Sequence, residues 1–267
     1  MNSDAPQLKA RQYVERMASS GRYSFSSAEA RAALRVTGDA TLLALNRLAK
    51  QKLLASPARG FYVIVPPEYR SLGCLPPEQF VPDLMTWLQR PYYVCLLSAA
   101  ELHGAAHQRP QALQVFLEGK RRPIACGRVR VDFMVRKGLG AVPVQTVNTP
   151  RGGLVVSTPE ATALDLVGYE QQAGGLNLVA TVLSELAERI DAQKLAAAAN
   201  AAPIVWAQRL GYLMQRAGAG DRVGLLQEHV REHARDATPL VPGRAFRTSA
   251  RDAAWKVYVN ATVEGDV

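Results

Sequence analysis

The first 65 residues alternate between apolar positions at helical spacing and short runs of β-forming residues. Apolar residues three or four positions apart predict helices over residues 8–19, 27–34 and 40–52. Ser27 is expected to cap the second helix, and the Val-Thr-Gly-Asp sequence at residues 36–39 predicts a tight turn before the third. Residues 53–65 predict two strands around a Pro-Ala-Arg-Gly turn. The pattern therefore predicts three helices followed by a β-hairpin.

Helix, turn, helix and a basic-tipped hairpin in this order predict a winged helix-turn-helix, a module that reads DNA. In the helix over residues 40–52, one apolar stripe comprises Thr41, Leu42, Leu45, Leu48 and Ala49. The opposite face is free to enter a major groove. The predicted DNA contacts lie on that face, on its flank and at the hairpin tip: Ala40, Leu43, Asn46, Arg47, Lys50 and Arg59.

Each of these side chains suits a different part of a DNA duplex. Arg47 suits the edge of a guanine and Lys50 a phosphate, while Leu43 or Ala40 suits a thymine methyl group. Arg59 at the hairpin tip is expected to reach a phosphate or the minor groove. The alternative is an ordinary solvated helix face. Leu43 favours DNA, because an apolar side chain at that position needs a partner.

The proline-rich segment Pro66–Phe80 is expected to act as a semi-rigid connector between two domains, at residues 1–70 and 80–267. After it, the pattern predicts a helix around residues 83–88 and an apolar helix within residues 90–106. Strands are predicted at residues 112–118, 129–135, 142–147, 154–156 and 255–259. Helices are predicted at residues 157–167, with Ser157 and Glu160 as its cap, and at residues 176–190, 192–201, 205–216 and 223–234. The expected fold class is therefore α+β or α/β in two domains, the second being a mixed α/β domain with a helical C-terminal half.

Charge is unevenly distributed along the chain, which has a formal net charge of +9. Residues 1–73 carry 11 Lys and Arg against 5 Asp and Glu, and residues 74–157 carry 10 against 5. Residues 158–267 carry 11 against 13. Cationic surfaces release counterions from nucleic acids, so this segregation favours nucleic-acid binding by residues 1–157.

Five arginines are candidates for additional nucleic-acid contacts: Arg121, Arg122, Arg128, Arg130 and Arg136. The last three have the same parity, so a regular strand would put them on one face, opposite Val129, Val131 and Phe133. This arrangement predicts a basic stripe on a sheet. An exposed sheet face without a nucleic-acid partner is an equally weighted alternative.

Composition also limits the class of protein. No apolar run approaches the length of a membrane span, and the first residues lack the pattern of a secretory signal, so a cytoplasmic protein is expected. The three cysteines, Cys74, Cys95 and Cys126, are too scattered for a disulfide framework or a zinc site and are expected to be buried thiols. No cofactor is expected, because the chain contains no phosphate-binding loop or dinucleotide fingerprint.

Two patterns raise the alternative of catalysis. His229-Val230-Arg231-Glu232-His233 matches a short zinc-protease motif, but a solvated charged helix is favoured because a third ligand is lacking. Glu101, Glu118 and Lys120 have the residue types of a one-metal nuclease, although a basic hairpin turn explains Lys120 as well. We therefore predict a protein that is not an enzyme and holds no metal. Asp165, in an apolar helix, is expected to need a nearby arginine if it is buried.

Three motifs in order resemble the AbiEi family, the antitoxins of type IV toxin–antitoxin systems, over most of the chain. They are GFYVIVPPEY at residues 60–69, YYVCLLSAAELHG at residues 92–104 and STPEATALDLV at residues 157–167. The resemblance implies a repressor that binds inverted repeats upstream of its own operon in double-stranded DNA. It also implies opposition to a nucleotidyltransferase-like toxin without a stable complex, in phage defence. A winged-helix nuclease and a ligand-responsive transcription factor remain the alternatives.

Overall fold

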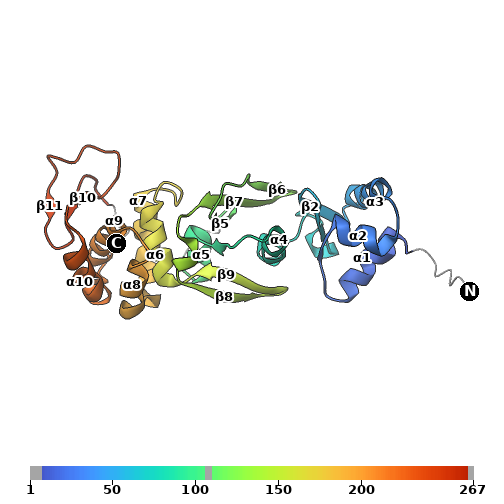
Figure 1. Cartoon of the computed structure of the whole chain (residues 1–267). Coiled ribbons are helices and arrows are strands. Elements are labelled where there is room, and N and C mark those ends of the chain that lie inside the picture. The colour runs from blue at the N-terminus through green and yellow to red at the C-terminus, as the bar shows by residue number, and fades with distance from the viewer. Residues whose placement is uncertain (1–7, 106–109, 264–267) are drawn as a thin grey trace, which may run out of the picture.

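The computed structural model describes residues 8–105 and 110–263 of the 267-residue chain. Its parts follow one another along an elongated molecule (Figure 1). The first three helices lie at one end, strands and α4 (Val81–Leu88) occupy the middle, and the last helices lie at the other end. The mixed α and β composition agrees with the α+β class expected from the sequence.

The N-terminal elements combine three helices with a small antiparallel sheet in the order β1-β3-β2. The helices are α1 (Ala10–Ser19), α2 (Ser27–Leu34) and α3 (Gly38–Lys50). The strands are β1 (Ser24–Ser26), β2 (Leu54–Ala58) and β3 (Phe61–Ile64). The sequence did not predict β1, because three residues buried on both sides show no alternation of apolar and polar positions.

The starts of α2 and α3 differ from the expected ones. Ser26, not Ser27, caps α2: its hydroxyl accepts from the Glu29 backbone N–H at 3.1 Å, while the Glu29 carboxylate accepts from the Ser26 N–H at 2.7 Å. The turn between the helices depends on Arg35, which has left-handed φ of 55° and ends α2. Gly38 therefore begins α3 as an ordinary helical residue, and Thr37 caps it by accepting from Ala40 N–H.

The proline-rich connector is packed into the protein rather than exposed as a spacer. It forms two single 3-10 turns, Pro67–Tyr69 and Pro77–Gln79, and between and after them Cys74, Leu75 and Phe80 are fully buried. These three side chains share one apolar cluster with Val63 of β3 and Val115 of the central sheet. The division into domains near residues 70–80 stays a prediction.

A six-stranded mixed sheet forms the middle of the molecule, in the order β6-β7-β5-β4-β9-β8. Its strands are β4 (Tyr93–Val94), β5 (Leu113–Leu117), β6 (Ile124–Cys126), β7 (Val129–Val135), β8 (Val144–Thr149) and β9 (Gly152–Ser157). β5 runs parallel to β7, and β4 runs parallel to β9. The apolar helix expected within residues 90–106 is shorter, since β4 pairs with β5 before α5 (Leu96–Leu102) begins.

The C-terminal half of the chain is mainly helical, as expected. It comprises α6 (Pro159–Gly168), α7 (Leu176–Leu186), α8 (Ala192–Ala199), α9 (Ile204–Arg216) and α10 (Gly224–His233). Three two-residue strands follow: β10 (Thr238–Pro239), β11 (Arg251–Asp252) and β12 (Val257–Tyr258). Thr158 caps α6 in place of Ser157, and Glu160 instead accepts from the Asp191 backbone N–H at 3.1 Å.

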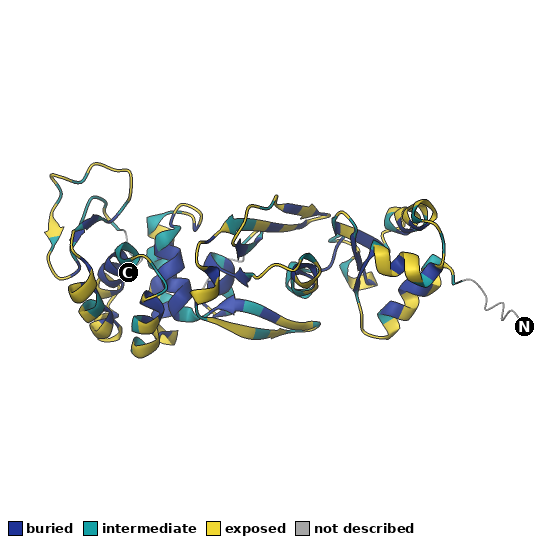
Figure 2. Ribbon diagram, in the orientation of Figure 1, coloured by how far each residue is buried: buried dark blue, intermediate teal, exposed yellow. Residues whose placement is uncertain are grey.

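Burial is concentrated in α6 and α9, while the outward faces of α1 and α3 are exposed (Figure 2). The largest apolar cluster joins these two buried helices to α7, α8, α10 and one side of the central sheet. A second cluster packs α4 against the other side of that sheet, and a third unites α1, α2 and α3. In the part of the chain that is described, no helix is both long enough and apolar enough to cross a membrane.

Candidate nucleic-acid interface

The outward face of α3 combines apolar and cationic side chains. Thr41, Leu45 and Leu48 are buried against α1 and α2, which fixes the rotation of the helix. All five predicted contacts on α3 are therefore exposed: Ala40, Leu43, Asn46, Arg47 and Lys50. Leu43 is 59% exposed and Leu42 is 43% exposed, although Leu42 was expected in the buried stripe. The sequence thus missed one apolar residue of this face, because Leu42 lies at the edge of the stripe.

Packing beneath α3 is mostly aromatic and aliphatic. Phe25 of β1 lies edge-on to Tyr13 of α1, with 5.2 Å between ring centres, and stacks on Tyr62 of β3 at 5.8 Å. Leu45 packs into the same cluster and is fully buried. At the start of α3, the Thr41 hydroxyl donates to the Thr37 carbonyl at 2.9 Å. These contacts fix the position of α3 on the other N-terminal elements, so its exposed face has a defined orientation.

The hairpin tip is short and lies against α4. Arg59 and Gly60 form the turn between the paired residues Ala58 and Phe61. The Gly60 carbonyl accepts from the Ser27 N–H at 2.8 Å, and the Phe61 ring lies 5.5 Å from that of Trp87 in α4. Arg59 itself is exposed. Its role as a DNA contact stays a prediction. The turn that carries Arg59 is held by the Ser27–Gly60 hydrogen bond and by the packing of Phe61 on Trp87.

Four of the five arginines near the central sheet are at least partly accessible. Arg122, Arg128 and Arg130 are exposed, and Arg130 donates to the Gly127 and Val129 carbonyls at 2.9 and 3.0 Å. Arg121 is half-buried with its guanidinium over the Phe133 ring, and burial together with the charge of Arg90 lowers the pKa of Arg121. The exposed Asp132 interrupts the expected basic stripe along β7.

Arg136 does not belong to that stripe, contrary to expectation. It follows the end of β7, where its side chain turns inward and is only 5% exposed. Its Nε lies 2.9 Å from the carboxylate of Asp165, which also accepts a 2.8 Å hydrogen bond from the Tyr93 hydroxyl. The guanidinium also lies over the Trp206 ring, 4.7 Å from its centre. The arginine partner expected for a buried Asp165 is therefore Arg136, and this pairing removes Arg136 from the surface.

Burial dominates the electrostatics of Asp165, whereas at Arg136 burial is outweighed by the charges of Asp165 and Tyr93, which raise the pKa of Arg136. Asp165 is fully buried, and loss of solvent raises the pKa of its carboxyl to about 6, although Arg136 and Tyr93 act in the opposite direction. The same burial raises the pKa of the Tyr93 hydroxyl, and the charge of Asp165 raises it further. The arrangement joins β4, the end of β7 and α6, and its position between elements indicates a structural role.

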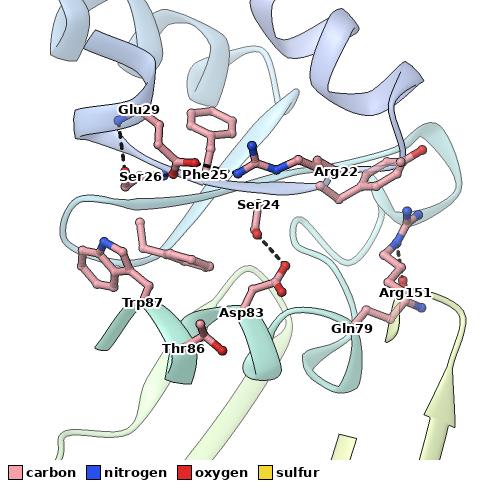
Figure 3. Close-up of a pocket in the computed structure, with 13 residues that line it drawn as sticks. Arg22, Ser24, Phe25, Ser26, Glu29, Gln79, Asp83, Thr86, Trp87 and Arg151 are labelled. Carbon is pink, nitrogen blue, oxygen red and sulfur yellow. Dashed lines mark hydrogen bonds and ion pairs between the residues drawn. The ribbon is translucent and has the colours of Figure 1, made fainter. Parts of the chain in front are cut away.

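A cleft with a volume of about 440 Å³ separates β1 and the start of α2 from α4. Most of its charged and polar side chains pair with one another, and the Ser24–Asp83 pair bridges the cleft (Figure 3). Arg22 contacts Glu29 at 2.6 Å, and the Ser24 hydroxyl donates to Asp83 at 2.6 Å. Arg151 lies over the Tyr23 ring and donates to the Gln79 side-chain oxygen at 2.7 Å. The Ser24–Asp83 and Arg151–Tyr23 contacts tie the N-terminal elements to α4 and to the β8–β9 hairpin.

The residues considered for catalysis are not brought together as a metal site. Glu118 and Lys120 are exposed in the turn after β5, while Glu101 lies half-buried on α5. Across residues 8–105 and 110–263, no group of three or more His, Cys, Asp or Glu could hold a metal ion. His229 and His233 stack with their ring centres 4.4 Å apart on α10, where His233 Nδ1 lies 2.9 Å from the His229 carbonyl.

Comparison with known proteins places part of the chain in a family. Residues 92–216 match the family described as AbiEi antitoxin C-terminal domain. No curated protein matches the sequence. Among solved structures, the RV2827C protein from Mycobacterium tuberculosis is similar over 95% of this chain and 94% of its own, with 17% identity and a TM-score of 0.66. This similarity shows a shared fold.

A second solved structure is an antigenic nucleotidyltransferase-like protein from Paracoccidioides brasiliensis. It covers 56% of this chain and 90% of its own, with 10% identity and a TM-score of 0.35.

Proposed function

The chain belongs to the AbiEi antitoxin family through residues 92–216, and we propose that this antitoxin is also a DNA-binding repressor of its own operon. The AbiEi family is not an enzyme family, and membership implies a toxin partner. In our proposal α1 to β3 act as a winged helix-turn-helix that binds inverted repeats in double-stranded DNA. The rest of the chain opposes a nucleotidyltransferase-like toxin of a type IV system, without forming a stable complex with it.

The observation that carries this proposal is the exposed face of α3. Leu42 and Leu43 are apolar and exposed, and they lie on the same helix as the exposed Arg47 and Lys50. Apolar groups beside cations suit the major groove, where thymine methyl groups and guanine edges adjoin phosphates. The element order, with β1 paired to β3 and a hairpin after α3, also agrees with a winged helix.

The direct test is a titration of the full chain against its own upstream DNA and against a scrambled duplex, at two salt concentrations. We expect a preference for the upstream DNA that survives the higher salt, because base contacts persist when phosphate contacts are screened. Equal binding to both duplexes, lost at higher salt, would contradict a repressor and reduce the N-terminal elements to a nonspecific anchor.

Arg47→Ala tests base reading. We expect it to weaken operator binding by about 1–3 kcal/mol and to relax the base preference at one position, because a guanidinium that contacts a guanine edge is lost. Binding should be measured on operator variants changed one base pair at a time. Arg231→Ala, on the exposed face of the distant α10, removes the same charge as a control. An equal loss on every operator variant would refute base reading by Arg47.

Lys50→Ala tests phosphate contact. We expect weaker binding to all sequences, because one phosphate contact is removed. The slope of the logarithm of the binding constant against the logarithm of the salt concentration should become smaller in magnitude by about one. The exposed Lys194 of α8 provides the control, since Lys194→Ala changes the net charge equally but lies far from α3. A salt slope that Lys50→Ala leaves unchanged would place Lys50 outside the interface.

The nuclease alternative predicts cleavage of DNA in the presence of Mg²⁺ and its loss in Glu118→Ala. We expect the wild-type chain to leave duplex DNA intact. Glu118 and Lys120 are exposed in the turn after β5, whereas Glu101 belongs to a different element, α5. Gel analysis after incubation with Mg²⁺ or Mn²⁺ decides the question. Metal-dependent cleavage that disappears in Glu118→Ala would replace the repressor proposal for this part of the chain.

A further inference from the structure

Two segments cross at the junction between the N-terminal elements and the central sheet. One is the connector at residues 72–74, and the other is the turn that joins β6 to β7 at residues 126–128. The Arg128 N–H donates to the Leu72 carbonyl at 2.7 Å. Gly73 and Gly127 lie face to face, so closely that a Cβ on Gly127 would sit 2.9 Å from the Gly73 carbonyl carbon. The segments run in opposite directions, which brings the next residues, Cys74 and Cys126, opposite each other.

The two thiols lie near enough to influence each other inside this crossing. Cys74 is fully buried and Cys126 is 9% exposed, and both belong to the apolar cluster beneath the sheet. Hydrogen bonding between the two thiols shifts their pKa values in opposite directions, and hydrogen bonding from the Ser56 backbone of β2 acts on the pKa of Cys126 as well. These hydrogen bonds lower the pKa of Cys126, aided by the charge of Arg130 and opposed by burial. The hydrogen bond to Cys126, and then burial, raise the pKa of Cys74.

We propose that Cys74 and Cys126 form an oxidation site that closes to a disulfide when the protein meets a hydroperoxide. Cys126 lies on β6, an edge strand of the sheet, and is the more exposed thiol, so it reacts first. Its thiolate attacks the terminal peroxide oxygen and becomes a sulfenic acid, while the peroxide O–O bond breaks and an alcohol or water leaves. The Cys74 sulfur then attacks the sulfenic sulfur, the S–S bond forms and water leaves. One hydroperoxide is thereby reduced and two thiols are oxidised.

The crosslink would join the connector to β6, beside β2 of the N-terminal sheet. Because it closes a loop between residues far apart in the chain, it restricts the unfolded state and raises the midpoint of thermal unfolding. Cys95 provides an internal comparison. It is fully buried between β4 and α5, where burial raises its pKa well above the usual range, and neither of the other thiols is bonded to it.

The experiment treats the reduced full chain with hydrogen peroxide and then counts free thiols and maps peptides without reduction. We expect the thiol count to fall from three to one, the mass to fall by two hydrogen atoms, and a peptide pair linking Cys74 to Cys126. A dithiol reductant should restore all three thiols and the original unfolding midpoint. Cys95→Ser should form the same crosslink.

Cys74→Ala keeps the residue small and apolar but removes the resolving thiol. We expect this variant to stop at a trappable sulfenic acid on Cys126 and to show no rise in the unfolding midpoint after oxidation. Three results would each overturn the proposal: three thiols that persist under peroxide, a crosslink that includes Cys95, or wild-type Cys126 that oxidises beyond sulfenic acid without a crosslink. Since free-thiol and peptide measurements need no DNA, they are independent of the repressor proposal.

Discussion

Asp165→Ala is expected to lower the free energy of unfolding by about 3–5 kcal/mol, because it leaves a buried arginine without its counter-charge. Arg136 is only 5% exposed and Asp165 is fully buried, so water cannot solvate the Arg136 charge when the Asp165 carboxylate is removed. The Tyr93 hydroxyl also loses its acceptor, which sits 2.8 Å away. Urea unfolding followed by circular dichroism measures the loss.

A double replacement separates the buried charge from the packing. Arg136→Met with Asp165→Leu removes both charges and retains similar volume, so we expect it to be far less destabilising than Asp165→Ala. The Trp206 ring, 4.7 Å from the Arg136 guanidinium, would then pack against an apolar side chain. A double variant as unstable as Asp165→Ala would mean that the ion pair is not the cause of the loss.

The same carboxyl predicts a dependence of stability on pH. Burial raises the folded-state pKa of Asp165 to about 6, above the ordinary value of 3.8, so the folded protein binds the proton more tightly than the unfolded chain. The part of the stability that comes from the tighter proton binding of Asp165 in the folded state is therefore full below about pH 4 and is lost as the pH rises through about 6. Asp165→Asn does not titrate, so the stability of the wild type relative to Asp165→Asn should fall between these two pH values. A relative stability that rises with pH would contradict this assignment.

Gly127→Ala is expected to destabilise the protein by about 2–4 kcal/mol, because two penalties combine at the crossing of the connector and the β6–β7 turn. Gly127 has φ of +59°, a conformation that other residues adopt at a cost. An added Cβ would also overlap the Leu72 carbonyl oxygen and lie 2.9 Å from the Gly73 Cα. Both neighbours are backbone, which cannot move aside as a flexible side chain does.

Gly138→Ala is the matched control for that variant. Gly138 has a similar φ of +66°, but nothing lies within 4 Å of the position its Cβ would occupy. It should therefore lose only the conformational part, about 1–2 kcal/mol, in the same urea unfolding measurement. Equal losses for the two variants would show that the close backbone crossing contributes nothing.

The sequence predicted α3 and its exposed face better than the limits of its neighbours. Strong apolar periodicity located α3 to within two residues at each end, and Arg47, Lys50 and Leu43 lie on the exposed side as expected. Periodicity could not decide between Leu42 and Leu48 as edges of the buried stripe, because both are close to Leu45 on a helical wheel. Contacts with α1 and α2 buried Leu48 and exposed Leu42.

The position of Arg136, by contrast, could not be predicted from the sequence. Alternation along β7 placed it on a basic stripe with Arg130, yet the strand ends at Val135 and alternation no longer applies beyond it. Asp165 lies on α6, many residues away in the sequence, and only the packing of α6 near the end of β7 brings its carboxylate to Arg136. The sequence did indicate the need for such a pair, because a carboxylate in an apolar helix requires a cation.

Local patterns by themselves determined the longer helices and most of the central strands, where charge is concentrated, and which motifs resemble the AbiEi family, since each depends on neighbouring residues. The tertiary structure decided which side of α3 is buried, that Arg136 is a buried partner of Asp165, and that Cys74 meets Cys126. Those three outcomes depend on contacts between distant segments. Such contacts are set by the free energy of packing the whole chain, which no local pattern contains.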